Sequence, residues 1–212
     1  MHDPHKQYDI VVFGASGYTG KLVAEYLAHE YKHDSLNWAL AGRSVTKLEA
    51  VRDELEILKS TNILNVDTNN PDSIIRMVES TKIVITTVGP YQLYGEELIK
   101  QCSKRGTDYV DLCGEPNWMQ QTIAHYSEAA KTSGARIVHS CGFDSIPFDL
   151  GIYYLQQHSI EQTGKPISTV KGRVRAMNGT FSGGTIASMR ATIAAVRADP
   201  KLIKILANPY SL

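Results

Sequence analysis

Residues 8–20 read Tyr-Asp-Ile-Val-Val-Phe-Gly-Ala-Ser-Gly-Tyr-Thr-Gly, and this stretch decides the fold. The apolar run at residues 10–13 is typical of a buried strand. Apolar residues recur at helical spacing after Gly20. Between the two lies a turn with glycines at positions 14, 17 and 20. The chain therefore predicts a strand, a tight glycine turn and a helix, in that order.

This turn has the pattern of a phosphate-binding loop. Gly14 allows a sharp turn, Gly17 allows backbone to approach a pyrophosphate, and Gly20 allows the helix to pack closely on the sheet. The helix that begins near Tyr18 directs its free N–H groups and positive dipole end at the phosphates. The alternative is a strand–turn–helix whose glycines serve packing alone. The candidate cofactor-binding residues of the turn are Gly14, Ala15, Ser16, Gly17, Tyr18, Thr19 and Gly20.

The end of the second expected strand, at residues 37–41, indicates which dinucleotide binds. An NAD site usually has Asp or Glu there, whereas this chain has Gly42, Arg43 and Ser44, with Lys47 one turn later. Arg43 can pair with a 2′-phosphate and stack on adenine, and Ser44 can donate to the phosphate or cap the next helix. We therefore expect NADP(H). The alternative makes Arg43 an ordinary solvated loop residue.

Two further strand ends complete the expected cofactor site. Asp67 follows the strand near residues 62–66, where it either bonds the adenine amine or serves as a turn residue. The fourth strand, near 82–88, ends at the sheet edge where ligands bind in open α/β folds. The candidate residues there are Val88, Gly89, Pro90 and Tyr91. A plain strand-end turn is the alternative for this Gly-Pro segment.

Composition excludes several classes of protein. The 212 residues carry a formal net charge of zero, so the chain lacks the basic stripe of a nucleic-acid-binding protein. Apolar runs are too short to span a bilayer, and residues 1–7 do not resemble a secretory signal. The three cysteines are widely spaced, which favours reduced thiols and a cytoplasmic protein without a metal site.

Strands and helices alternate through the first part of the chain. Strands are expected near 8–13, 37–41, 62–66, 82–88, 108–112 and 135–140, and helices near 18–31, 44–56, 71–79, 93–105 and 116–132. Such alternation predicts a doubly wound parallel sheet of the Rossmann type, over residues 1–145.

The pattern changes in residues 146–212, where we expect the start of a mixed α/β second domain. A helix is expected over 148–157, and a half-exposed strand over 167–177, where apolar and basic residues alternate. Asn178-Gly179 indicates a hairpin or bulge, and an amphipathic helix follows Thr185. One strand and one helix cannot bury a sheet face, so this domain is expected to be truncated. It is also the candidate surface for a homodimer.

Several motifs together resemble the saccharopine dehydrogenase-like oxidoreductases, in the branch of trans-acting enoyl reductases. They are the glycine turn, Ala41-Gly42-Arg43, Gly89-Pro90-Tyr91, the segment 108–115, the segment 141–151 (Cys-Gly-Phe-Asp-Ser-Ile-Pro-x-Asp-Leu-Gly), and Ser182-Gly183-Gly184-Thr185-x-x-Ser188. The resemblance implies an NADP-binding Rossmann domain and a mixed domain that covers the nicotinamide. It implies reduction of an enoyl, imine or carbonyl-type substrate. Members of this family are about twice as long.

Hydride transfer needs a well-placed nicotinamide and often one proton donor. Asp144 lies in the loop after the sixth strand, where it either carries a proton or caps the next helix. Tyr91 offers a hydroxyl or an aromatic wall. Asp111 and Glu115 either join the site or hold their loop through backbone N–H groups. Ser182 and Thr185 either bind a substrate anion or cap a helix.

Two other functions stay open. A Cys-dependent acyl-phosphate-type reductase would use Cys141 as nucleophile, but that thiol ends an apolar strand and only His158 follows it, so a structural role is favoured. A non-catalytic NADP-binding module would use the fold to bind a partner. A short-chain dehydrogenase is excluded, because no Tyr is followed by Lys four residues later.

Overall fold

The computed structural model describes residues 6–31 and 36–212. Residues 1–5 and 32–35, which the expected N-terminal domain includes, lie outside the described part of the chain. Within it, a six-stranded parallel sheet has the order β3-β2-β1-β4-β5-β6. This is the doubly wound order, which confirms the Rossmann-type prediction.

The strands that form the sheet are short and largely apolar. They are β1 (Tyr8–Phe13), β2 (Trp38–Gly42), β3 (Asn62–Asn65), β4 (Thr81–Thr86), β5 (Asp108–Val110) and β6 (Ile137–Val138). Central strands β1 and β2 read as near-continuous apolar runs because helices cover both of their faces. The expected strand at 135–140 is only two residues long, at the edge of the sheet.

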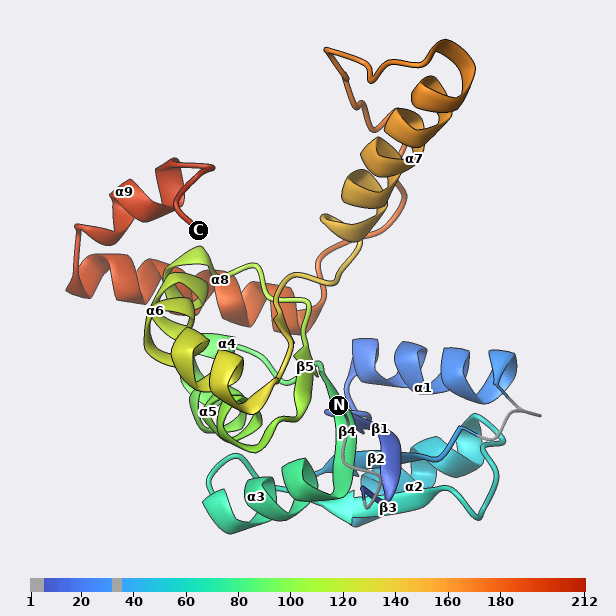
Figure 1. The fold of residues 1–212 in the computed structure, drawn as a ribbon. Helices are drawn as coiled ribbons and strands as arrows, with labels where there is room; N and C mark the ends of the chain where they lie inside the picture. The colour runs from blue at the N-terminus through green and yellow to red at the C-terminus, as the bar shows by residue number, and fades with distance from the viewer. Residues whose placement is uncertain (1–5, 32–35) are drawn as a thin grey trace.

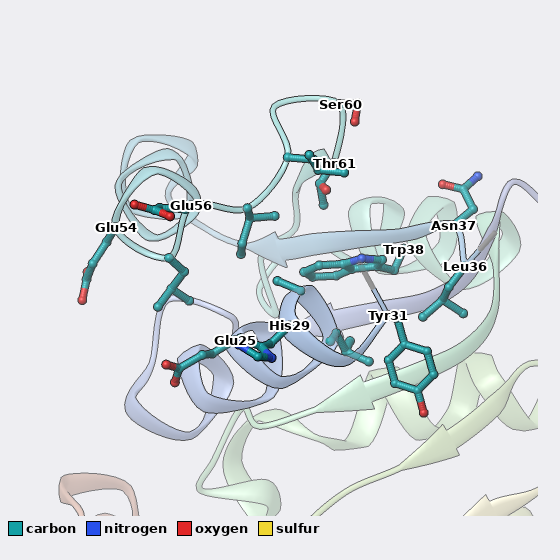
Figure 2. A pocket seen from close by; sticks show the side chains of 15 residues that line it. Glu25, His29, Tyr31, Leu36, Asn37, Trp38, Glu54, Glu56, Ser60 and Thr61 are labelled. Atoms are coloured by element: carbon teal, nitrogen blue, oxygen red, sulfur yellow. The ribbon is translucent and has the colours of Figure 1, made fainter. Parts of the chain in front are cut away.

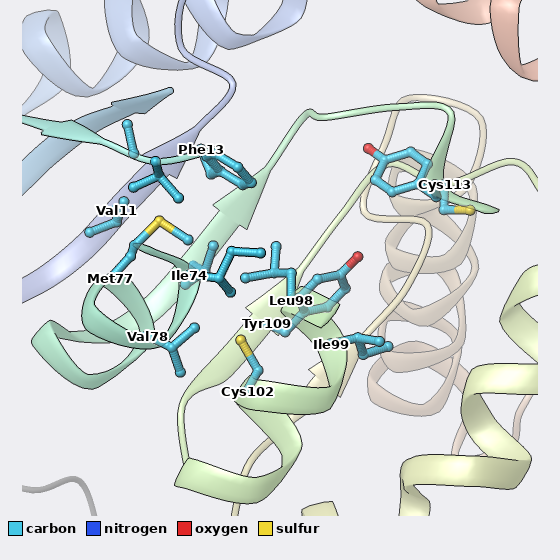
Figure 3. Close-up of a cluster of buried hydrophobic side chains, with 14 of the residues drawn as sticks. Val11, Phe13, Ile74, Met77, Val78, Leu98, Ile99, Cys102, Tyr109 and Cys113 are labelled. Carbon is cyan, nitrogen blue, oxygen red and sulfur yellow. The ribbon is translucent and has the colours of Figure 1, made fainter. Parts of the chain in front are cut away.

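Helices lie on both faces of the sheet (Figure 1). On one face, α1 (Tyr18–Glu30) and α2 (Val45–Glu54) pack around Leu27, Leu40 and Leu48. On the other lie α3 (Pro71–Ser80), α5 (Glu96–Arg105) and α6 (Pro116–Ser133). Figure 3 shows the larger core between these helices and the sheet, with Val11 and Phe13 facing Ile74, Met77 and Leu98.

The helix expected over 93–105 is divided in two. A short helix α4 (Tyr91–Tyr94) precedes α5, and Gly95 separates them. A Cβ at Gly95 would lie 2.7 Å from the Trp118 ring and 2.9 Å from the Tyr91 carbonyl oxygen. The close approach of α6 to this turn therefore requires a glycine, which local sequence could not reveal.

The C-terminal part departs most from expectation. Helix α7 (Ile146–Thr163) is longer than expected, and α8 (Gly183–Ala198) and α9 (Leu202–Ala207) follow it. The strand expected over 167–177 is wrong, because residues 165–182 contain neither helix nor strand. The hairpin signal at Asn178-Gly179 is wrong for the same reason: within the described residues, no strand lies beside this segment to pair with it.

Candidate functional site: the cavity at the carboxyl ends of the strands

The glycine turn joins β1 to α1 with the geometry that a phosphate needs. Gly14 has φ +92°, a conformation that favours glycine, and a Cβ on Gly20 would lie 2.1 Å from the Gly14 carbonyl oxygen. A Cβ on Gly17 would lie 3.3 Å from that same oxygen. Helix α1 starts after Gly17 with no side-chain cap and no acid in its first turn. The first-turn N–H groups are thus free for an anion, and the cradle fits a pyrophosphate.

Other residues of the turn hold it in place. Ala15 is fully buried, and its N–H and that of Gly14 both donate to the Ala41 carbonyl at the end of β2. Thr87, just past β4, donates its hydroxyl to the Gly14 carbonyl at 3.2 Å. Sequence reasoning missed Thr87, although its place directly before Val88 at a strand end was a usable signal. Ser16 and Thr19 are half-buried, whereas Gly17 and Tyr18 between them are exposed.

The end of β2 presents the residues expected to select the phosphorylated cofactor. Gly42 is buried under Leu48, whereas Arg43 and Lys47 are exposed. Ser44 caps α2 by accepting a hydrogen bond from the Lys47 N–H at 3.4 Å. Among the described residues, no carboxylate forms an ion pair with Arg43. Its guanidinium is therefore available to an anion supplied from outside the protein.

Asp67 serves as a turn residue. Its Oδ1 accepts from the Asn69 N–H at 2.9 Å, and its backbone N–H and carbonyl both contact the Ser73 hydroxyl at 3.1 Å. These bonds link the end of β3 to the start of α3. The turn role is confirmed, and a contact with adenine stays a prediction.

The segment after β4 is held from behind by a buried carboxylate. Glu115 is 1% exposed, and its two oxygens accept from the backbone N–H groups of Tyr91 and Gln92, each at 2.9 Å. Asp111, 2% exposed, likewise accepts from the N–H groups of Cys113 and Ser140 at 2.9 and 2.8 Å. Both carboxylates thus hold loops at the carboxyl ends of the strands by accepting hydrogen bonds from backbone N–H groups. This is one of the two roles expected for them.

Tyr91 lies against this sheet edge with its hydroxyl turned inward. The hydroxyl donates to the Thr86 carbonyl at 3.3 Å and accepts from the Leu112 N–H at 3.4 Å. Burial, and then the charge of Asp111, raise the pKa of the Tyr91 phenol far above its usual range. The ring borders the same cavity as Gly89, whose peptide bond to Pro90 is cis. This geometry favours a role for the Tyr91 ring as an aromatic wall of the cavity, and its role as proton donor stays a prediction.

A cavity of about 790 Å³ joins these parts. One wall comes from the glycine turn and strand ends: Tyr18, Thr19, Thr87, Gly89, Tyr91, Leu112 and Gly114. The loop after β6 adds Gly142, Phe143 and Asp144, and the region around α8 adds Thr180, Phe181, Ser182, Gly184, Thr185, Ser188, Met189, Thr192 and Ile193. Sequence motifs placed Ser182 and Thr185 in the family pattern but did not show that α8 covers the cavity.

Helix α8 is connected to the cofactor loop. The Gln92 side chain donates to the Thr192 hydroxyl at 3.2 Å, and a Cβ on Gly89 would lie 3.7 Å from the Ser188 hydroxyl. Ser182 caps α8, since its hydroxyl oxygen accepts from the Thr185 N–H at 3.2 Å. The capping role of this pair is confirmed, and anion binding by it stays a prediction.

Asp144 and Cys141 lie on the loop after β6, where residues 142–144 line the cavity. The Asp144 side chain is exposed, and within the described residues it makes no capping bond to α7, whose N-cap is Ser145. The Cys141 thiol is half-buried and donates to the Val138 carbonyl at 3.6 Å. Burial, and then the charge of Asp111, raise the pKa of this thiol. A nucleophilic cysteine requires the opposite shift.

A second cavity, of about 650 Å³, lies at the amino ends of β2 and β3 (Figure 2). Glu25, Glu54 and Glu56 are among its lining residues, and these acids would repel a phosphate. It also lies at the end of the sheet opposite to the glycine turn.

Among the described residues, no helix is long and apolar enough to cross a membrane, and no group of three or more His, Cys, Asp or Glu is placed to bind a metal.

Comparison with known protein families shows to which family the sheet-forming part of the chain belongs. Residues 10–138 match the saccharopine dehydrogenase NADP binding domain. The chain belongs to this family. Its domain is an NADP-binding domain, which confirms the cofactor expected from the glycine turn and Arg43. The resemblance noted from the motifs is confirmed as well.

Relatives extend the match to the whole chain. A Mycobacterium tuberculosis protein described as a "putative trans-acting enoyl reductase" is 43% identical over 208 residues, which are 98% of this chain and 49% of that protein. A Mycobacterium bovis protein described as a "trans-acting enoyl reductase" is 36% identical over 214 residues, which are 100% of this chain and 51% of that protein. The chain thus spans about half the length of these relatives.

Solved structures agree on the fold. Apo saccharopine dehydrogenase (L-Glu forming) from Saccharomyces cerevisiae matches with a TM-score of 0.52 and 15% identity, over 74% of this chain and 32% of that one. Pen from Bacillus thuringiensis matches with a TM-score of 0.51 and 13% identity, over 75% of this chain and 59% of that one. At these identities the likeness concerns architecture alone.

Proposed function

We propose that the chain is the cofactor-binding half of an NADPH-dependent reductase that acts on an enoyl, imine or carbonyl-type substrate. One observation carries the proposal: the glycine turn, the Gly89–Tyr91 segment and α8 all line one cavity at the carboxyl ends of the strands. Two relatives that match nearly the whole chain are named as enoyl reductases, which supports the enoyl substrate among the three.

The protein's own part in this reaction is to bind and orient. NADPH, when bound, supplies the hydride. The N–H groups at residues 18–20 hold the pyrophosphate, and Arg43, Ser44 and Lys47 hold the 2′-phosphate. Tyr91 and Gly89 form the surface beside the nicotinamide, while α8 limits access of water. Asp144 reaches the same cavity and is the proposed proton donor.

The direct test is a titration with NADPH and NADH, read by fluorescence or calorimetry. The native chain should bind NADPH more tightly, and Arg43→Ala should remove about 1.5–3 kcal/mol of that preference, the usual value of a hydrogen bond to a charged group. This corresponds to about 10- to 100-fold in affinity. The matched control is Lys59→Ala, an exposed cation in the turn between α2 and β3. Equal affinity of the native chain for both nucleotides would contradict the proposal.

A non-catalytic NADP-binding module is the second candidate. The observation that favours it is the length of the relatives, which is about twice that of this chain. Part of a substrate site can lie in the half of the relatives that this chain does not match. NADPH binding with no oxidation by enoyl thioesters, imines or carbonyl compounds would support it. Turnover that falls in Asp144→Asn while NADPH affinity stays unchanged would support the reductase instead.

A further inference from the structure

A buried histidine, His139, contacts the carboxylate that follows β5. The side chain of His139 is 10% exposed and that of Asp111 is 0% exposed, and His139 Nδ1 lies 2.8 Å from Asp111 Oδ2. The Tyr109 hydroxyl donates to the same oxygen, also at 2.8 Å. A carboxylate only accepts hydrogen bonds, so Nδ1 of the ring carries the proton. Two side-chain donors thus fix Oδ2, and Oδ1 is left for backbone N–H groups.

The surroundings of the His139 ring keep it in this orientation. The rings of Tyr109 and Trp118 pack edge-on against it, with centroid distances of 5.8 and 5.3 Å. Its second nitrogen, Nε2, lies 3.3 Å from the hydroxyl of Thr122 on α6. The side chain borders a cavity of about 230 Å³ between α5, α6 and β6, and it does not line the larger cavity of the candidate site. Any effect of His139 on that site therefore passes through Asp111.

Asp111 in turn holds the loop that follows His139. Its Oδ1 accepts from the Ser140 N–H at 2.8 Å, and its carbonyl accepts from the Cys141 N–H at 2.6 Å. Ser140 has φ +59°, a left-handed conformation that is costly for a residue with a side chain and needs support from its surroundings. The chain then continues into residues 142–144, which line the cavity of the candidate site.

We propose that His139 is a positioning residue of the candidate site. By donating to Asp111, it keeps the carboxylate aligned with the Ser140 N–H and thereby keeps residues 142–144 at the wall of the cavity. Asp144, the proton donor of the proposed reaction, belongs to this segment. The inference rests on the proposed function in that last step alone, because the order of the loop can be measured without NADPH or substrate.

Two substitutions separate the roles of the two ring nitrogens. The amide nitrogen of asparagine takes the place of Nδ1, and that of glutamine takes the place of Nε2. His139→Asn should therefore keep the bond to Asp111, and His139→Gln should lose it. The rate at which iodoacetamide alkylates Cys141, followed by mass spectrometry, reports opening of the loop. We expect this rate to rise about tenfold in His139→Gln, which loses a hydrogen bond to a charged group, and to stay within about twofold of the native rate in His139→Asn.

Two further variants serve as controls. His125→Gln changes an exposed histidine of α6 and should leave the alkylation rate unchanged. Thr122→Val removes the partner of Nε2 but not the bond to Asp111, so the rate should stay within about twofold of native. All of these variants should bind NADPH as the native chain does, because the glycine turn is untouched. Where the native chain oxidises NADPH, His139→Gln should lower kcat with little change in the KM for NADPH, and His139→Asn should restore kcat.

The remaining outcomes decide against the proposal or against the function on which it rests. Equal alkylation rates in His139→Asn and His139→Gln would overturn it, because filling the space would then matter and the Nδ1 bond would not. Fast alkylation in His139→Asn overturns it alone, so the test does not require that His139→Gln folds. Fast alkylation in Thr122→Val would transfer the role to Nε2. The expected alkylation pattern in a chain that binds no NADPH would support the hold of His139 on the loop and contradict the proposed function.

Discussion

Glu115 accepts hydrogen bonds from the N–H groups of Tyr91 and Gln92 through its two carboxylate oxygens, each at 2.9 Å. These residues are 24 and 23 positions apart in the chain, and they meet because β4 and β5 are neighbours in the sheet. The carboxylate compensates for the four-residue helix α4, which has no side-chain cap of its own. Glu115 thereby positions the segment after β4, whose Gly89 and Tyr91 border the cavity at the carboxyl ends of the strands.

Glu115→Gln should therefore destabilise the protein and weaken NADPH binding together. The amide keeps one acceptor oxygen but places an NH2 group against a backbone N–H, in a site that is 1% exposed. We expect a loss of about 1–3 kcal/mol in the free energy of unfolding, measured by urea denaturation. The control is Glu128→Gln, whose side chain is 87% exposed and should change neither quantity. Native stability in Glu115→Gln would show that the carboxylate does not hold α4.

Gly20→Ala should disrupt the phosphate turn. Its Cβ would lie 2.1 Å from the Gly14 carbonyl oxygen and 2.8 Å from the Ala15 Cα, and neither is the end of a flexible side chain. Overpacking of this kind costs about 1–3 kcal/mol, and α1 must move away from the sheet to relieve it. We expect lower stability and loss of NADPH binding in a calorimetric titration.

The comparison for this variant is Gly151→Ala, in the exposed helix α7. No atom lies within 4 Å of a Cβ at Gly151. Alanine in a helix interior is favoured over glycine by about 0.5–1 kcal/mol, so stability should rise slightly and NADPH affinity should stay the same. If both glycine variants bound NADPH normally, close packing of α1 on the turn would not be needed for the site.

Local sequence signals predict the Rossmann part because each signal reflects a physical requirement of the strand or helix that it marks. Buried parallel strands are short apolar runs, and Pro71 and Pro116 stand at the first turns of α3 and α6 as expected. Gly106 and Gly134 end helices with φ +66° and +80°, the left-handed conformation expected of C-terminal caps. The order of the strands then follows from right-handed connections.

The features that sequence could not reveal depend on distant contacts. The close approach of Trp118 requires a glycine at position 95, and the carboxylate of Glu115 finds its N–H partners on another loop. The alternation at 167–177 predicts a strand, but alternation specifies only which face is apolar. A strand also needs a neighbour to pair with, and the described residues provide none.

Asp9 should make folding stability depend on pH in the acid range. The hydrogen bond from Lys82, at 2.7 Å, and that from the Asn37 N–H, at 2.9 Å, lower the pKa of the Asp9 carboxyl below its usual value. A lowered folded-state pKa stabilises the fold above the unfolded pKa, about 3.9, and this contribution is lost as pH falls through the folded value. The Asp9–Lys82 ion pair is partly exposed, so it contributes about 0.5–1 kcal/mol to the free energy of unfolding.

Asp9→Asn should accordingly lower the free energy of unfolding at pH 7 and change it much less at pH 2. Urea titrations at the two pH values, with native and variant chains, measure this difference. Asp53→Asn, at an exposed position in α2, is the control. An equal effect of Asp9→Asn at both pH values would mean that the ionised carboxylate is not the stabilising group.

Cys141 should behave as an unreactive thiol. Burial and the charge of Asp111 raise its pKa, so the thiolate is scarce at neutral pH. Alkylation of Cys141 by iodoacetamide should be slower than that of free cysteine at pH 7, and its rate should still rise with pH where that of free cysteine has levelled off. Mass spectrometry of the digested protein measures this, and Cys102 and Cys113, which are 0% and 3% exposed, serve as slow internal references.

Cys141→Ser should retain NADPH binding and any NADPH oxidation of the native chain within about twofold, since a hydride transferred directly to the substrate needs no thioester on the enzyme. Rapid alkylation at pH 7, together with loss of turnover in Cys141→Ser, would instead establish the covalent route.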